Sequence, residues 1–105
     1  DMANASIHVM NIDKKTYNEH TTSMCSHINI GSNKELSIKE LAETIKEIVG
    51  FKGKINFDLT KPDGSHRKFL DSKRINNLGF KPVLSLKEGL IITYQEYIIK
   101  LNENI

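Results

Sequence analysis

The chain has 105 residues, of which 38% are hydrophobic and 27% charged, and its formal net charge is +2 at pH 7. This composition fits one folded domain and excludes a largely disordered chain, and the small net charge excludes a general polyanion binder. The sequence holds no apolar run of membrane-spanning length, and its single cysteine excludes an internal disulfide. We therefore expect a soluble, cytoplasmic domain in which any anion site is local.

The first predicted element is a helix that opens with Asp1 as its N-cap. Its apolar residues recur at helical spacing: Met2, Ala5, Val9 and Ile12. Because the chain starts on a helix, without an initiator methionine or a leader, we expect it to be part of a longer protein. Residues 13–26 are polar and aperiodic, which predicts a surface loop.

A strand, a helix and a second strand are predicted next. The β-branched run 27–30 is typical of a buried strand. A helix should begin at Ser37, which has capping-box spacing to Glu40, and end at Gly50. Residues 54–58 form the second predicted strand. Together these elements predict a right-handed, parallel βαβ unit.

Two further helices follow in the last third of the chain. We expect Asp71 to cap a short helix that Gly79 ends, and Ser85 with Glu88 to open the last helix by a second capping box. An apolar stripe runs along that last helix: Leu86, Leu90, Tyr97 and Leu101, with Ile91 and Ile98 alongside. The expected fold class is α/β, a small lobe of about four helices and two short parallel strands that forms one domain over residues 1–105.

Residues 61–71, K-P-D-G-S-H-R-K-F-L-D, form a candidate anion loop. They follow the second predicted strand, and parallel α/β units gather ligands beyond the carboxyl ends of their strands. Arg67 and Lys68 are suited to neutralising a phosphate, and Asp63 is suited to accepting hydrogen bonds from a sugar diol. The alternative is a solvated turn that carries two surface cations.

The other chemistry-bearing residues show no comparable pattern. The four histidines and Cys25 lack the spacing of a metal site or of an activated nucleophile. No G-x-G-x-x-G motif occurs, and Tyr97 and Lys100 are three residues apart where a catalytic Tyr-x-x-x-Lys pair needs four. The cations are dispersed, and no nucleic-acid-binding signature appears. We expect no metal, cofactor or nucleic-acid site in this chain.

Three stretches of the sequence resemble one known family. They are D-M-A-N-A-S-I-H-V-M-N, the segment from S-H-I-N-I-G to K-I-N-F-D, and the segment that starts with K-P-D-G. These stretches resemble the C-terminal third of the GDP-L-fucose synthase family, which are extended short-chain dehydrogenase/reductases of the NAD-dependent epimerase/dehydratase type. The resemblance runs from residue 1 to about 98, and it includes a D-x-x-R/K-x-x-x-L-G-F/W pattern that starts at Asp71. His66 stands where the family often has proline.

This resemblance implies a full-length NADP(H)-dependent 3,5-epimerase and 4-reductase that converts GDP-4-keto-6-deoxy-D-mannose to GDP-L-fucose. The family binds its cofactor and carries its Ser-Tyr-Lys catalytic set in an N-terminal Rossmann domain that this chain lacks. The resemblance therefore implies no catalytic residue here and an inactive isolated fragment. It implies that Arg67 and Lys68 face the phosphates or sugar of a GDP-sugar and that Asp63 faces the nucleotide. The implied partners are the GDP-sugar and the enzyme's own Rossmann domain, with no nucleic acid or membrane, in a cytoplasmic homodimer.

Two alternatives stay open. The chain could be the same domain of an epimerase/reductase for another GDP-deoxy-sugar, because the sugar-reading residues of the family lie mostly outside it. It could also be a stand-alone module that binds an anion or an acidic protein through residues 61–71.

Overall fold

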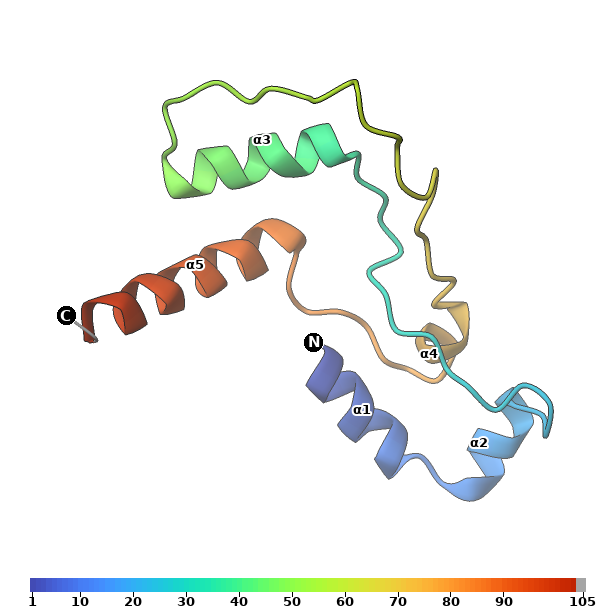
Figure 1. Cartoon of the computed structure of the whole chain (residues 1–105). Coiled ribbons are helices and arrows are strands. Elements are labelled where there is room, and N and C mark those ends of the chain that lie inside the picture. The colour runs from blue at the N-terminus through green and yellow to red at the C-terminus, as the bar shows by residue number, and fades with distance from the viewer. Residues whose placement is uncertain (104–105) are drawn as a thin grey trace. The chain divides into compact units, whose positions relative to one another are not determined.

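A computed structural model describes residues 1–103, which contain five helices where about four were predicted. In chain order these are α1 (Met2–Asn11), α2 (Lys14–His20), α3 (Ile38–Val49), α4 (Lys73–Asn77) and α5 (Leu86–Glu103) (Figure 1). The chain divides into two compact units. Unit 1 comprises Asp1–Glu35 and Arg67–Val83 and holds α1, α2 and α4. Unit 2 comprises Leu36–His66 and the residues from Leu84 onward and holds α3 and α5.

Contacts between α1 and the residues that follow α4 help to hold unit 1 together. Ala5 on α1 and Ile75 on α4 are its two fully buried apolar residues. The Nε2 atom of His8 lies 2.8 Å from the carbonyl oxygen of Leu78, and the His8 ring lies 5.8 Å from the ring of Phe80. The core of the unit is therefore small, and polar contacts supplement it.

The two helix starts predicted in unit 1 differ in detail from the expectation. Asp1 is the N-cap of α1, but its side chain makes no capping bond there. Its Oδ1 instead accepts a hydrogen bond from the backbone N–H of Val83, at 3.2 Å. Helix α4 begins after Ser72, and the Asp71 carboxylate still accepts a bond from Lys73 N, at 2.9 Å. Gly79 follows α4 with φ 92°, the left-handed conformation that favours glycine at a helix end.

The loop predicted over residues 13–26 is wrong in its first half, where α2 forms. The Asp13 side chain caps this helix, accepting bonds from Thr16 N at 3.0 Å and from Thr16 Oγ1 at 2.6 Å. None of its residues is fully buried, so the helix does not need an apolar stripe. Its sequence therefore lacks the apolar periodicity that would predict a helix. Its end is tied back to the following loop, because the Tyr17 hydroxyl donates to the carbonyl of Ser26 at 2.6 Å.

Unit 2 consists of α3 and α5, which pack against each other (Figure 1). Both predicted capping boxes are present. The N–H of Glu40 donates to Ser37 Oγ at 3.1 Å while the Glu40 carboxylate accepts from Ser37 N at 2.8 Å. Glu88 N donates to Ser85 Oγ at 3.2 Å, and the Glu88 carboxylate accepts from Ser85 N at 2.7 Å. Gly50 ends α3 in the left-handed conformation, as predicted.

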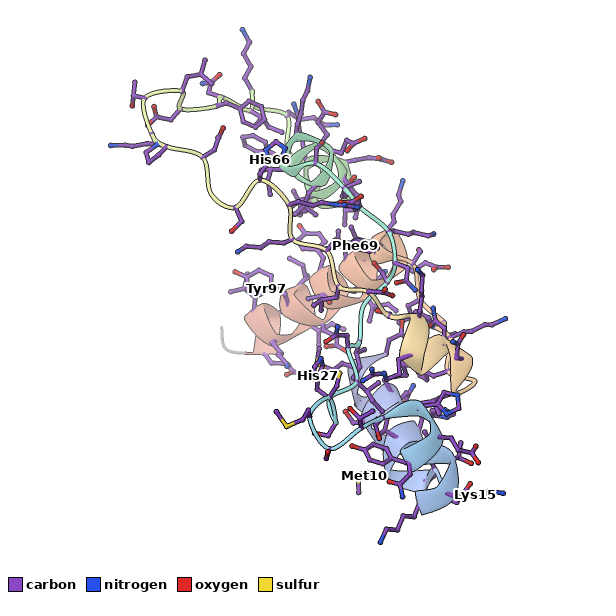
Figure 2. All side chains as sticks on the ribbon, turned by 90° about the vertical axis from the view of Figure 1, so that its right-hand side faces the viewer. Met10, Lys15, His27, His66, Phe69 and Tyr97 are labelled. Atoms are coloured by element: carbon purple, nitrogen blue, oxygen red, sulfur yellow. The ribbon has the colours of Figure 1, made fainter. Side chains whose placement is uncertain are left out.

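The apolar stripe predicted for α5 is only partly covered by α3. No described residue of α5 is fully buried, and Tyr97 (labelled in Figure 2) is 58% exposed. An apolar cavity of about 280 Å³ lies between the two helices. It is lined by Ile45, Ile48, Val49, Leu90, Thr93, Tyr94 and Tyr97. The apolar stripe of α5 is therefore only partly buried, and much of it faces solvent.

The two predicted strands are not formed: residues 1–103 contain no strand, and their one β-type contact is an isolated antiparallel bridge between Thr22 and Cys25. A strand exists only when its backbone groups pair with a neighbouring strand. Segment 27–30 belongs to unit 1 and segment 54–58 to unit 2, and neither makes a backbone–backbone hydrogen bond within the described residues. The α/β expectation is thus confirmed only in its helical part.

Candidate functional site

The candidate loop, residues 61–71, has no regular secondary structure and crosses from unit 2 into unit 1. A side-chain turn precedes it, in which Asp58 Oδ1 accepts from Thr60 N at 3.0 Å and from Thr60 Oγ1 at 2.6 Å. Asp63 and His66 belong to unit 2. Both are exposed and make no hydrogen bond or ion pair with any residue that the structure describes.

Arg67 is the first residue of the second segment of unit 1, and it forms a two-point ion pair with Glu35. Its Nε donates to Glu35 Oε1, and its Nη2 donates to Glu35 Oε2 at 2.7 Å. The guanidinium carbon also lies 5.0 Å from the centroid of the Phe69 ring (labelled in Figure 2), within range of a cation–π contact. The hydrogen bonds from Arg67 lower the pKa of Glu35 below its usual value, and Glu35 in turn raises the pKa of Arg67. Both groups therefore stay charged around neutral pH.

Lys68 differs from its neighbour. It is exposed, and within the described part of the chain it takes part in no hydrogen bond or ion pair. Its ammonium group is therefore free to act as a point charge for an anionic ligand. The two cations predicted from the sequence thus divide into one that is already paired and one that is free.

Arg74 binds the backbone on both sides of the point where the first predicted strand, 27–30, begins. Its Nη1 donates to the carbonyl oxygens of Cys25, at 3.1 Å, and His27, at 2.6 Å. Its Nη2 lies 3.4 Å from the Cys25 sulfur. Arg74 was predicted only as part of a shared pattern, and its partners lie 47 and 49 residues away along the chain. Cys25 is thus a free, partly buried thiol whose sulfur lies beside the guanidinium of Arg74.

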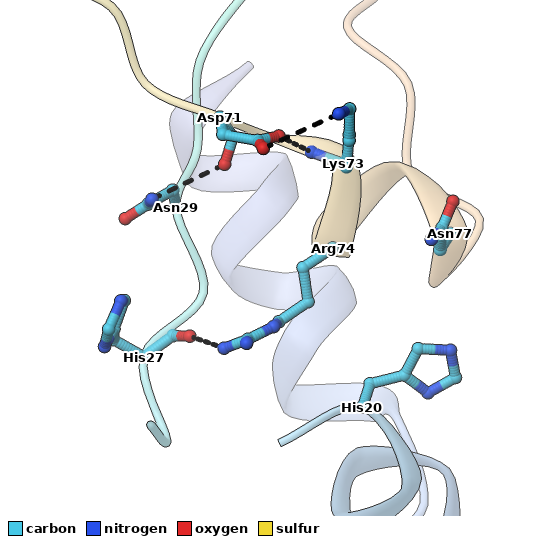
Figure 3. Close-up of a pocket in the computed structure, with 7 residues that line it drawn as sticks. All are labelled: His20, His27, Asn29, Asp71, Lys73, Arg74 and Asn77. Atoms are coloured by element: carbon cyan, nitrogen blue, oxygen red, sulfur yellow. Dashed lines mark hydrogen bonds and ion pairs between the residues drawn. The ribbon is translucent and has the colours of Figure 1, made fainter. Parts of the chain in front are cut away.

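A polar pocket of about 400 Å³ lies in unit 1 around Arg74 (Figure 3). It is lined by His20, His27, Asn29, Asp71, Lys73, Arg74 and Asn77. Figure 3 shows that several of these groups bind one another: Asn29 donates to the carbonyl of Asp71 at 3.4 Å, and Lys73 lies 3.9 Å from the Asp71 carboxylate. Three separate segments supply the pocket, and no spacing in the sequence indicated it. Among its charged groups, Arg74 links two of those segments, whereas Asp71 and Lys73 interact with each other.

Two features that bear on the chemistry are absent from residues 1–103. No group of three or more His, Cys, Asp or Glu side chains is placed to hold a metal ion. None of the helices in this part of the chain has the length and apolarity needed to cross a membrane.

Comparison with known proteins confirms the resemblance to the GDP-L-fucose synthases. The chain is 48% identical over 98 residues to the GDP-L-fucose synthase of Escherichia coli (strain K12), a match that covers 93% of this chain and 30% of the relative. It is 56% identical over 72 residues to the putative GDP-L-fucose synthase 2 of Arabidopsis thaliana, covering 69% of this chain and 22% of that protein. The chain therefore spans less than a third of the length of these relatives.

The chain is also similar to proteins that are not named GDP-L-fucose synthase. The putative UDP-glucose 4-epimerase of Methanocaldococcus jannaschii is 41% identical over 63 residues, which is 60% of this chain and 21% of the relative. A solved structure named DdhaC is 40% identical and superposes with a TM-score of 0.75, covering 96% of this chain and 28% of that one. No family model matches the chain. The similarity thus extends to a relative named as an epimerase of another nucleotide sugar.

Proposed function

We propose that this chain is the C-terminal, nucleotide-sugar-binding domain of a longer enzyme that makes GDP-L-fucose. The observation that carries the proposal is the 48% identity over 93% of the chain with a protein named GDP-L-fucose synthase. Because the chain spans only 30% of that relative, most of the enzyme lies in polypeptide beyond these residues. The reaction proposed for the complete enzyme is the NADP(H)-dependent 3,5-epimerisation and 4-reduction of GDP-4-keto-6-deoxy-D-mannose.

The residues of this chain do not fit the NADP(H) cofactor. A dinucleotide fold needs closely spaced glycines at the start of a helix, and the six glycines here, Gly31, Gly50, Gly53, Gly64, Gly79 and Gly89, never take the G-x-G-x-x-G spacing. We therefore assign the cofactor and the catalytic residues to the N-terminal Rossmann domain. The role of this chain is to bind and orient the GDP-sugar, and alone it should be inactive.

The substrate-binding residues we propose are Asp63, Arg67 and Lys68. The free ammonium of Lys68 supplies a point charge for the diphosphate, and the planar guanidinium of Arg67 supplies directed N–H groups. Asp63 is exposed and unpaired within residues 1–103, which leaves its carboxylate available to hydroxyl or amine groups of the nucleotide. In the complete enzyme, loss of Lys68 should weaken GDP binding about tenfold or more, since a charged hydrogen bond is lost.

We also propose that segments 27–30 and 54–58 become parallel strands in the complete enzyme. Both have the β-branched composition of strands, and neither has a backbone partner within the described residues. Amide exchange of the full-length protein tests this: slow exchange at alternate amides of both segments supports pairing, and fast exchange throughout contradicts it. The complete enzyme is proposed to be a cytoplasmic homodimer.

The decisive experiment uses the full-length protein in which this chain occurs. It is supplied with NADPH and GDP-4-keto-6-deoxy-D-mannose, and the loss of NADPH absorbance and the formation of GDP-L-fucose are measured. Turnover supports the proposal, and a folded, NADPH-binding protein that gives no GDP-L-fucose refutes it. The relative named as a UDP-glucose 4-epimerase favours one alternative, an enzyme for another nucleotide sugar. A panel of other GDP-keto-sugars and UDP-glucose separates that alternative from the first proposal. A stand-alone anion-binding module would give no turnover with any of them.

A further inference from the structure

The Arg67 guanidinium has two edges that can each bind a planar anion. Within residues 1–103, Glu35 binds one of them. Nε and Nη2 form the edge that faces the Glu35 carboxylate. The opposite edge, made by Nη1 and the second proton of Nη2, has no partner within residues 1–103. Two-point binding of phosphate by arginine uses such an edge. The pair with Glu35 is therefore compatible with simultaneous anion binding by Arg67.

The segment that carries Glu35 is itself fixed against the segment that carries Arg67. Asn33, which takes a left-handed backbone conformation with φ 55°, accepts a hydrogen bond from Ser72 N through its Oδ1, at 3.2 Å. Two residues earlier, a Cβ added at Gly31 would lie 3.1 Å from the Ser72 hydroxyl, so the two backbones approach closely there. Glu35 is thus presented from a backbone that is anchored on the same stretch of chain as Arg67.

Stability alone gives little reason for this pair. The side chains of Arg67 and Glu35 are 63% and 49% exposed, and exposed ion pairs usually contribute little to folding. Yet the guanidinium is held at two points on one edge and lies over the Phe69 ring. These contacts restrict a long side chain that would otherwise sample many rotamers, and immobilising such a side chain is one of the costs of binding a ligand.

We propose that Glu35 is a positioning residue that holds Arg67 with its Nη1 edge presented to the diphosphate of a nucleotide sugar. This inference rests on the proposed function and adds Glu35 to its recognition apparatus. Glu35 does not touch the ligand and acts only through Arg67. The opposite role is a competitor, in which the carboxylate occupies the arginine that the ligand needs.

The two roles predict opposite effects of Glu35→Gln on affinity. A competitor, once neutralised, frees Arg67 and removes a negative charge near the phosphate, so binding tightens by about two- to threefold or more. If Glu35 is a positioning residue, neutralising it leaves the Arg67 side chain mobile, so the ligand must order that side chain on binding. The free-energy cost of this ordering exceeds the electrostatic gain from removing the Glu35 charge. We expect GDP to bind about two- to fivefold more weakly to Glu35→Gln than to the wild type.

The test measures GDP binding to the full-length protein by isothermal titration calorimetry. The variants are Glu35→Gln, Arg67→Ala and the double variant. In the Arg67→Ala background the positioning role has nothing to act on, so Glu35→Gln should leave GDP affinity unchanged or slightly tighter there. The loss of GDP affinity caused by Glu35→Gln should thus appear only when Arg67 is present. Glu47→Gln is the matched control, because Glu47 forms a comparably exposed ion pair with Lys87, at 2.8 Å, in unit 2.

Arg67→Lys separates positioning from a merely structural ion pair. Lysine can still pair with Glu35, so a structural role predicts wild-type GDP affinity. The positioning role predicts a loss of about tenfold, as for Arg67→Ala, because an ammonium has no second edge. Tighter or unchanged binding by Glu35→Gln in the wild-type background overturns the inference while the proposed function stands. Unaltered GDP binding in both Arg67→Ala and Lys68→Ala removes the proposed site, and the inference with it.

Discussion

Replacing Ile75 by alanine should selectively destabilise unit 1. Ile75 is 1% exposed and is the largest fully buried side chain within residues 1–103. The substitution removes three carbon groups from the buried side chain, which at ~0.8 kcal/mol each amounts to ~2.4 kcal/mol of lost transfer free energy. The cavity left behind adds to this, so the total loss should be about 2–5 kcal/mol. With so small a core, that loss is a large fraction of the stability of the unit.

Amide hydrogen exchange of the full-length protein measures this effect locally. We expect faster exchange throughout α1 and α4 and an unchanged rate in α3 and α5. Ile75→Val keeps most of the side chain and should cost about 0.5–1.5 kcal/mol. Ile7→Ala is the matched control, because Ile7 on α1 is 56% exposed, and it should cost about 0.5 kcal/mol or less. If Ile75→Ala accelerates exchange no more than Ile7→Ala, the assignment of Ile75 to the core of unit 1 is wrong.

Three other predictions concern backbone approach, capping and pH. Gly31→Ala should destabilise unit 1, because its Cβ would lie 3.1 Å from Ser72 Oγ, and faster exchange of the Ser72 amide would reveal this. Ser37→Ala removes the N-cap of α3 and should cost about 1 kcal/mol by urea unfolding, whereas a loss near zero would mean that α3 does not depend on its cap. The side-chain and backbone hydrogen bonds from Ser37 lower the pKa of Glu40. This stabilisation is present above the usual glutamate pKa and fades as pH falls through the lowered value, so an NMR titration should show the Glu40 pKa rise in Ser37→Ala.

The helices that follow from local chemistry were predictable from the sequence. Ser37 with Glu40 and Ser85 with Glu88 are each three residues apart, and both capping boxes form as predicted. Helix α2 was missed because none of its residues is fully buried and its sequence carries no apolar period. Its one readable signal was Asp13 three residues before Thr16, an N-cap spacing without an apolar run behind it.

The remaining features depend on partners that are distant in the sequence. The strands predicted at 27–30 and 54–58 need a neighbouring strand, and a local pattern does not say whether one is present. Arg67 was identified as a candidate anion ligand from its loop, but its partner Glu35 lies 32 residues away. A single sequence gives no signal for such a pair. Geometry was needed to show which edge of Arg67 is occupied.

The discontinuous path of the chain through unit 1 has a consequence for the order of folding during synthesis. The first segment of the unit, Asp1–Glu35, leaves the ribosome well before Arg67–Val83, which supplies α4 and the buried Ile75. The contacts of His8 on α1 with Leu78 and Phe80 therefore cannot form until the whole of Leu36–His66 has been made. Unit 1 can close once Val83 has emerged, but α3 gains its partner only when α5 follows. A translation pause placed just after Val83 should thus favour completion of unit 1 before unit 2 begins to assemble.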